Sequence, residues 1–150
     1  MPKERIETAK KFYTDDEQNH IVQAIREWEK NSYGEIKIHL EDNCKGDAVE
    51  QGKKWFKKLG LANTEKKTGV LIYMAVKTHR FAVLGDSGID LKVEPGFWES
   101  VVWIIEEHFK DQLYVEGVIE AIKMIGRTLE MHFPNPEDRK NEIPNDLSFG

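Results

Sequence analysis

Hydrophobic residues recur along the chain at two spacings, one typical of helices and one typical of strands. A capping box, Thr14-Asp15-Asp16-Glu17, precedes apolar residues at every third or fourth position and predicts a helix that ends by Gly34. A second cap at Asp47 predicts another helix, which Gly60 would end. Two more helices are expected on either side of Asp111-Gln112. The residues expected on the buried faces of these four helices are Ile21, Ala24, Ile25 and Trp28; Val49, Trp55, Phe56 and Leu59; Phe97, Trp98, Val101, Val102, Ile105 and Phe109; and Val115, Val118, Ile119, Ile122, Ile125 and Leu129.

Three segments have the pattern of strands. Residues 35–40 alternate strictly, which predicts a half-buried strand with His39 on its polar face. Residues 70–76 form a continuous apolar run, typical of a central strand that is covered on both faces. A tight turn at 77–79 joins it to a third strand over 80–84, so these two strands should form an antiparallel hairpin. Residues 85–96 are expected to be a long irregular loop, with a weak pattern for a short fourth strand at 89–93.

This order of elements predicts a three-layer α/β/α sandwich. Helices on both faces are the usual way to cover such a sheet, which should have at least three strands. The length of 150 residues fits one domain. We expect this domain to span residues 1–133, followed by an acidic, Pro-rich tail over 134–150 that is extended or disordered.

Composition narrows the classes of function. The 27 acidic and 22 basic residues give a net charge of -5, which argues against a nucleic-acid partner. A single cysteine, Cys44, excludes an internal disulfide framework and a Cys-rich zinc site. The charged amino-terminal residues do not resemble a signal peptide, and no apolar run approaches the ~20 residues needed to span a bilayer. We therefore expect a soluble cytoplasmic protein without membrane insertion.

The predicted topology brings several carboxylates to one end of the sheet. Strands 35–40 and 70–76 should be parallel, and a register that pairs Val76 with His79 would place Gly69 opposite Asp86. The acidic residues then expected near this end are Glu35, Glu65, Asp86, Asp90 and Glu94. Clustered carboxylates repel one another unless a proton or a cation neutralises them, and oxygen ligands favour Ca²⁺ or Mg²⁺ over Zn²⁺. A solvated loop surface that caps nearby helices is an equally good interpretation of the same spacing.

Other motifs are weaker. Residues 85–88 read GDSG, as in the nucleophile loop of trypsin-like proteases, but the following residues and the α/β order do not fit that class. Cys44 and His39 offer a thiol–imidazole pair, although a lone cysteine after a strand is more often incidental. The chain has no HExxH motif and no Gly-rich phosphate-binding loop.

Two longer segments resemble a known family. The segments at 68–73 and 81–89 are similar to the hallmarks of the TPM-domain family. Further similarities are Phe97-Trp98, a glycine near the start of the last helix, and His132-Phe133-Pro134. Residues 141–144 resemble a subgroup that is common in the Bacteroidetes, and the resemblance runs over about residues 10–150. It implies a stand-alone TPM domain with a Rossmann-like α/β/α sandwich and a central sheet of four strands.

The resemblance also implies candidate functions. A small stand-alone member of this family is described as binding divalent metals at a pair of crossing loops, which implies Glu65, Asp86 and Asp90 as ligands here, with Glu35 and Glu94 as second choices. We therefore expect a Ca²⁺- or Mg²⁺-binding regulatory or interaction module with a protein partner that is unknown. Plant relatives are described as acid phosphatases, so a metal-dependent phosphatase is an alternative, with Lys66, Lys67 and Lys92 as the available phosphate-binding groups. A protein-interaction domain that binds no metal is a third hypothesis.

Overall fold

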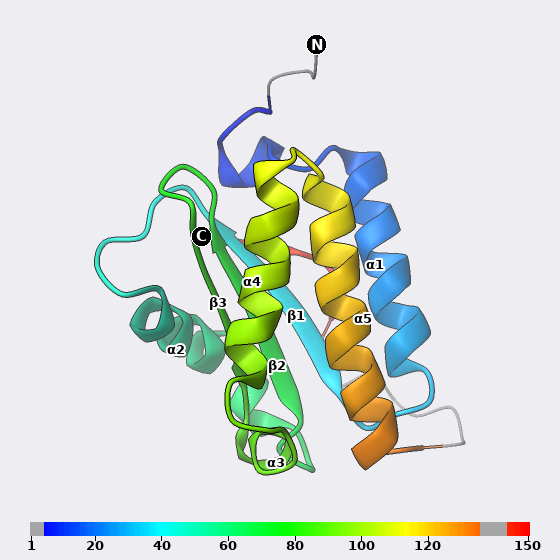
Figure 1. Cartoon of the computed structure of the whole chain (residues 1–150). Helices are drawn as coiled ribbons and strands as arrows, with labels where there is room; N and C mark the ends of the chain where they lie inside the picture. The colour runs from blue at the N-terminus through cyan, green and yellow to red at the C-terminus, as the bar shows by residue number, and fades with distance from the viewer. Residues whose placement is uncertain (1–4, 136–143) are drawn as a thin grey trace.

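The computed structural model describes residues 5–135 and 144–150 (Figure 1). In chain order, its elements are η1 (Ala9–Lys11), α1 (Asp15–Glu29), β1 (Glu35–Glu41), α2 (Ala48–Lys58), η2 (Leu61–Asn63), β2 (Gly69–Ala75), β3 (Arg80–Gly85), α3 (Ser87–Asp90), α4 (Phe97–Lys110), α5 (Tyr114–His132) and β4 (Ser148–Phe149). Within these residues, no helix is long and apolar enough to cross a membrane.

The strands form a mixed sheet in the order β3-β2-β1-β4. β1 pairs in parallel with β2 and with β4, and β2 pairs antiparallel with β3. Ala75 lies opposite Arg80 and Val70 opposite Gly85, which confirms the register expected for the hairpin. The predicted parallel pairing of the first two strands is also confirmed.

Two layers of helices cover this sheet, as the α/β/α prediction requires. α1, α4 and α5 pack on one face, and α2 lies on the other (Figure 1). The larger core lies under the three helices, and a smaller core that includes Leu71 and Tyr73 lies between the sheet, α2 and η2. The first helix begins as predicted, because Thr14 and Glu17 form both hydrogen bonds of a capping box.

Three local expectations are wrong. Val49 is 41% exposed, and Gly52 takes the buried position on α2 where a Cβ would meet Leu84 at 2.4 Å. The loop after β3 contains the short helix α3 and no strand at 89–93, because Asp86 caps a helical turn there. β1 is buried along its length except at Glu41, where a half-buried strand was expected.

Part of the tail that was expected to be extended or disordered is extended and lies against the sheet. Residues 144–150 pack along β1 and supply β4, so this part of the tail is a component of the sheet. It also explains why β1 is buried, because the side of the strand that carries its polar residues is covered by α2 and by this segment. The expectations for residues 136–143 lie outside the described residues.

Candidate metal site

The loops before β2 and after β3 cross at the amino end of the parallel strands. The Asp86 amide donates to the Gly69 carbonyl at 2.9 Å, and the Ile89 amide donates to the Lys67 carbonyl at 3.2 Å. The first loop is held in place by Thr68, whose amide donates to the Thr64 hydroxyl at 3.0 Å. These bonds place the predicted Glu65 loop and Asp86 loop in direct contact.

Gly88 makes this close crossing possible. A Cβ at this position would lie 2.2 Å from the carbonyl oxygen of Lys66 and 2.5 Å from that of Lys67. Any side chain would therefore force the loops apart. As a result, two backbone carbonyl oxygens lie directly against the first turn of α3.

Asp86 lies at this crossing, and its two carboxylate oxygens have different surroundings. Its Oδ1 accepts from the Ser87 amide at 2.8 Å and so caps α3. Its Oδ2 is buried and has no hydrogen-bond partner within the described residues. The same side chain lines a shallow cleft of about 180 Å³ together with Lys53 and Phe56 of α2. A buried carboxylate oxygen without a donor is costly unless a proton, water or cation meets it.

Asp90 lies on the same short helix and has a different role. Its Oδ1 accepts from the Trp98 indole nitrogen at 2.8 Å. The Trp98 ring in turn packs against Gly85, where a Cβ would lie 2.2 Å from the ring. Asp90 therefore holds the start of α4 against the end of β3, and this bond uses one of its two oxygens.

The other three predicted acids lie around the crossing without converging on it. Glu35 is fully buried and pairs with Gly69, which places it two strands away from Asp86, roughly 10 Å. Glu65 and Glu94 are exposed on their loops. Within the residues that the structure describes, no three Asp, Glu, His or Cys side chains are grouped so that they could hold a metal ion. Any cation here would depend on backbone carbonyls and water for most of its ligands.

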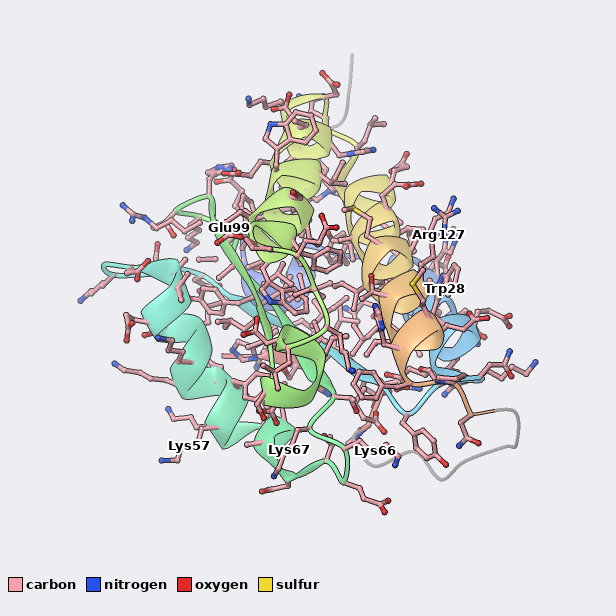
Figure 2. The ribbon with its side chains drawn as sticks, turned by 60° about the horizontal axis from the view of Figure 1, so that its bottom comes forward. Trp28, Lys57, Lys66, Lys67, Glu99 and Arg127 are labelled. Carbon is pink, nitrogen blue, oxygen red and sulfur yellow. The ribbon has the colours of Figure 1, made fainter. Side chains whose placement is uncertain are left out.

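Lysines border the crossing but have partners of their own. Figure 2 brings this end of the molecule forward and shows Lys66 and Lys67 on the loop next to α3. The Lys67 ammonium donates to the Ala62 carbonyl at 2.9 Å, and the Lys66 ammonium lies 4.7 Å from the centre of the Tyr33 ring. These contacts do not form a ready-made phosphate cradle.

Sequence reasoning missed a second cluster of polar residues at the opposite end of β1. His39 is fully buried and its ring stacks on Trp55, with the ring centres 3.8 Å apart. The His39 pKa is lowered to about 4, chiefly by burial; Glu41 raises this pKa, whereas Lys37 and Lys58 lower it. Strict alternation identified this polar face of the strand, but it carried no signal that other elements would cover it.

Comparison with known proteins agrees with this fold. A family model described as TPM domain matches residues 7–128. The solution structure of protein BA42 from the psychrophilic bacterium Bizionia argentinensis has 36% sequence identity and a TM-score of 0.86, over 97% of this chain and 100% of that one. The solution structure of the amino-terminal domain of a protein from P. gingivalis shares the fold at 17% identity and a TM-score of 0.60, over 85% of this chain and 82% of that one. No curated protein sequence matches this chain. Since the family model covers most of its length, the chain belongs to the TPM-domain family.

Proposed function

We propose that this TPM domain binds a hard divalent cation, Ca²⁺ or Mg²⁺, where the two loops cross, and that the bound ion orders this surface for a protein partner. The observation that carries the proposal is the buried Oδ2 of Asp86, which has no hydrogen-bond partner within the described residues. Asp86 caps the short helix α3, whose first turn packs against the carbonyl oxygens of Lys66 and Lys67. Carboxylate and carbonyl oxygens are the ligands that Ca²⁺ takes in proteins.

The donor set favours weak binding. Asp86 would supply the one buried carboxylate oxygen, and Asp90 would supply the oxygen that Trp98 does not use. Sites with few charged ligands bind Ca²⁺ with dissociation constants of roughly 10⁻⁴–10⁻³ M. Mg²⁺ would bind through one carboxylate and retain most of its water ligands. Glu65, whose loop contributes the carbonyls, is the nearest candidate for a further ligand.

Binding at the crossing would stabilise both loops. An ion that binds only the folded chain adds about 2.7 kcal/mol to the free energy of unfolding at 100 times its dissociation constant. The same increment would oppose local opening of the two segments that the ion joins, 64–68 and 86–90. Such a response to metal is the physical basis for a regulatory module.

Calorimetric titration tests this proposal with a matched pair of variants. Asp86→Asn keeps an oxygen to cap α3 and removes the charge, whereas Asp47→Asn makes the same change at the cap of α2, where Asp47 accepts from the Val49 amide at 3.3 Å. We expect wild type and Asp47→Asn to bind Ca²⁺ with similar heats, and Asp86→Asn to lose binding at least tenfold. Absence of binding to wild type at 10 mM Ca²⁺ or Mg²⁺, or unchanged binding to Asp86→Asn, would refute the proposal.

The two alternatives have different outcomes in parallel assays. Metal-dependent turnover of an aryl phosphate that Asp86→Asn abolishes would indicate a phosphatase. Capture of a protein partner that is insensitive to chelator, in a chain that binds no metal, would indicate an interaction domain independent of metal.

A further inference from the structure

Residues 144–150 lie along the edge of β1, and we call the surface that they cover there the groove. The Lys37 ammonium donates to the carbonyls of Pro144 and Asp146. Ser148 and Phe149 then pair with His39 and Leu40. The segment therefore runs alongside β1 from Lys37 to His39 and Leu40.

Side chains of this segment alternate between two environments. Leu147 is 7% exposed and belongs to the larger core, against which Phe149 also packs. Ser148 lies on the other side, with its hydroxyl 2.8 Å from Nδ1 of His39. The groove therefore accepts the order aliphatic, small polar, aromatic.

Gly150 continues this pattern in the tightest part of the groove. Its amide donates to the Leu40 carbonyl at 2.9 Å. A Cβ on Gly150 would lie 2.8 Å from each of three atoms: His39 Nε2, Glu41 Cγ and Trp55 Cζ2. This position consequently admits glycine and excludes larger residues.

One wall of the groove is organised by contacts that do not involve residues 144–150. Glu41 accepts from the Trp55 indole nitrogen at 2.8 Å, from the Gln51 amide at 3.2 Å and from the Tyr73 hydroxyl. Trp55 is thereby fixed, and His39 stacks on it. Because these side chains are already ordered before a peptide binds, less conformational entropy is lost on binding.

Two buried polar groups of β1 face the segment. Lys37 is 6% exposed, and its ammonium donates to two carbonyls of the segment. His39 Nε2 is buried, next to Gly150, and has no hydrogen-bond partner within the described residues. Buried polar groups of this kind need an occupant that offers main-chain acceptors and small side chains.

We propose that the edge of β1 is a recognition site for an extended peptide, and that residues 144–150 fill it as a ligand from the same chain. The partner would be a protein segment of the type aliphatic–Ser–aromatic–Gly, which adds a parallel strand to the sheet where β4 lies here. Main-chain bonds supply affinity in this mode of recognition, and pockets for alternate side chains supply specificity. Because the resident segment is tethered, it competes at an effective concentration in the millimolar range.

Anisotropy of a labelled peptide tests the proposal in the full chain. The probe is the amidated heptapeptide of residues 144–150, Pro-Asn-Asp-Leu-Ser-Phe-Gly. The Gly150→Val chain changes only the resident segment and should leave the groove open, so it should bind the probe at least tenfold more tightly than wild type does. A probe with valine in place of its glycine is the matched control and should not bind. In the Gly150→Val chain, Lys37→Met should weaken binding at least tenfold, because it removes two bonds from a charged donor.

Two results would overturn this inference. One is a folded Gly150→Val chain, with the helical circular dichroism of wild type, that does not bind the probe. The other is that the Gly150→Val chain forms a dimer in which a second copy of the chain fills every groove, so that this second copy is the occupant. If Gly150→Val does not fold, amide chemical shifts of wild type provide the readout instead. Millimolar probe should then shift the resonances of residues 39–41, and unchanged shifts would also overturn the proposal.

Discussion

The buried imidazole of His39 predicts that acid destabilises this protein through one identifiable group. In the folded chain the His39 pKa is about 4, chiefly because burial disfavours the charged ring. In the unfolded chain the pKa should be near its ordinary value of 6.5. Between these values the unfolded chain binds the proton and the folded chain does not, so the free energy of unfolding falls as the pH falls.

The size of the effect follows from the difference between these pKa values. Each pH unit of pKa difference corresponds to about 1.4 kcal/mol, so the full shift would correspond to about 3 kcal/mol. We reduce this to about 2 kcal/mol because solvent partly screens the charges that face the ring. These charges are Glu41 and Lys37 on β1 and Lys58 on α2, with the uncharged Trp55 and Ser148 in direct contact.

Urea unfolding between pH 7.5 and 4 measures this effect when wild type is compared with His39→Gln. Other carboxylates titrate in the same range, so the informative quantity is the difference between the two chains. Glutamine can contact the Ser148 hydroxyl but does not titrate. The stability advantage of wild type over His39→Gln should shrink by about 2 kcal/mol on acidification, mostly between pH 6.5 and 4. His20→Gln, on the exposed surface of α1, should run parallel to wild type. Parallel curves for wild type and His39→Gln would refute the reasoning.

Three further substitutions test other contacts. Gly88→Ala should lower the free energy of unfolding by about 1–3 kcal/mol and weaken Ca²⁺ binding, because its Cβ would overlap the Lys66 carbonyl. Urea unfolding measures the first effect and calorimetry the second. A variant with unchanged stability and unchanged binding would contradict the close crossing of the loops. Tyr73→Phe should cost about 1–2 kcal/mol in the same unfolding assay, since it removes one of the three donors to the Glu41 carboxylate, and an unchanged midpoint would argue against that bond. Thr14→Ala should cost about 1 kcal/mol, read from thermal or urea unfolding, by removing the cap of α1; Thr14→Ser should restore most of that stability.

Local sequence patterns predicted most of this fold because the residues that begin and end most elements can be recognised in the sequence. The capping box at Thr14 predicted the start of α1, and the continuous apolar run at 70–76 predicted the central strand. The short connection at 77–79 left only a hairpin, and its register followed from the length of the turn. Topology alone therefore placed the Asp86 loop beside β2, before any side-chain contact was known.

The rest depends on contacts between residues that are distant in the sequence. No local pattern indicates that Ser148 pairs with His39, more than a hundred positions earlier, so the polar face of β1 was expected to be exposed. The site was predicted as a group of acids, whereas the close contact there depends on Gly88 and two backbone carbonyls. Carbonyl positions are a property of the folded loop and have no signature in residue type.

The candidate metal site and the peptide groove lie on different strands, which makes them separable by experiment. The groove begins at Lys37, two residues along β1 from Glu35, and Asp86 lies two strands away from Glu35, so Asp86 and Lys37 are separated by roughly 12 Å. Charges this far apart are screened at physiological ionic strength, where the Debye length is about 8 Å. Asp86→Asn should consequently leave probe binding to the Gly150→Val chain unchanged, and Gly150→Val should leave the Ca²⁺ affinity unchanged. Loss of both activities through either single substitution would show that the sheet itself had been disrupted, and neither local explanation would then stand.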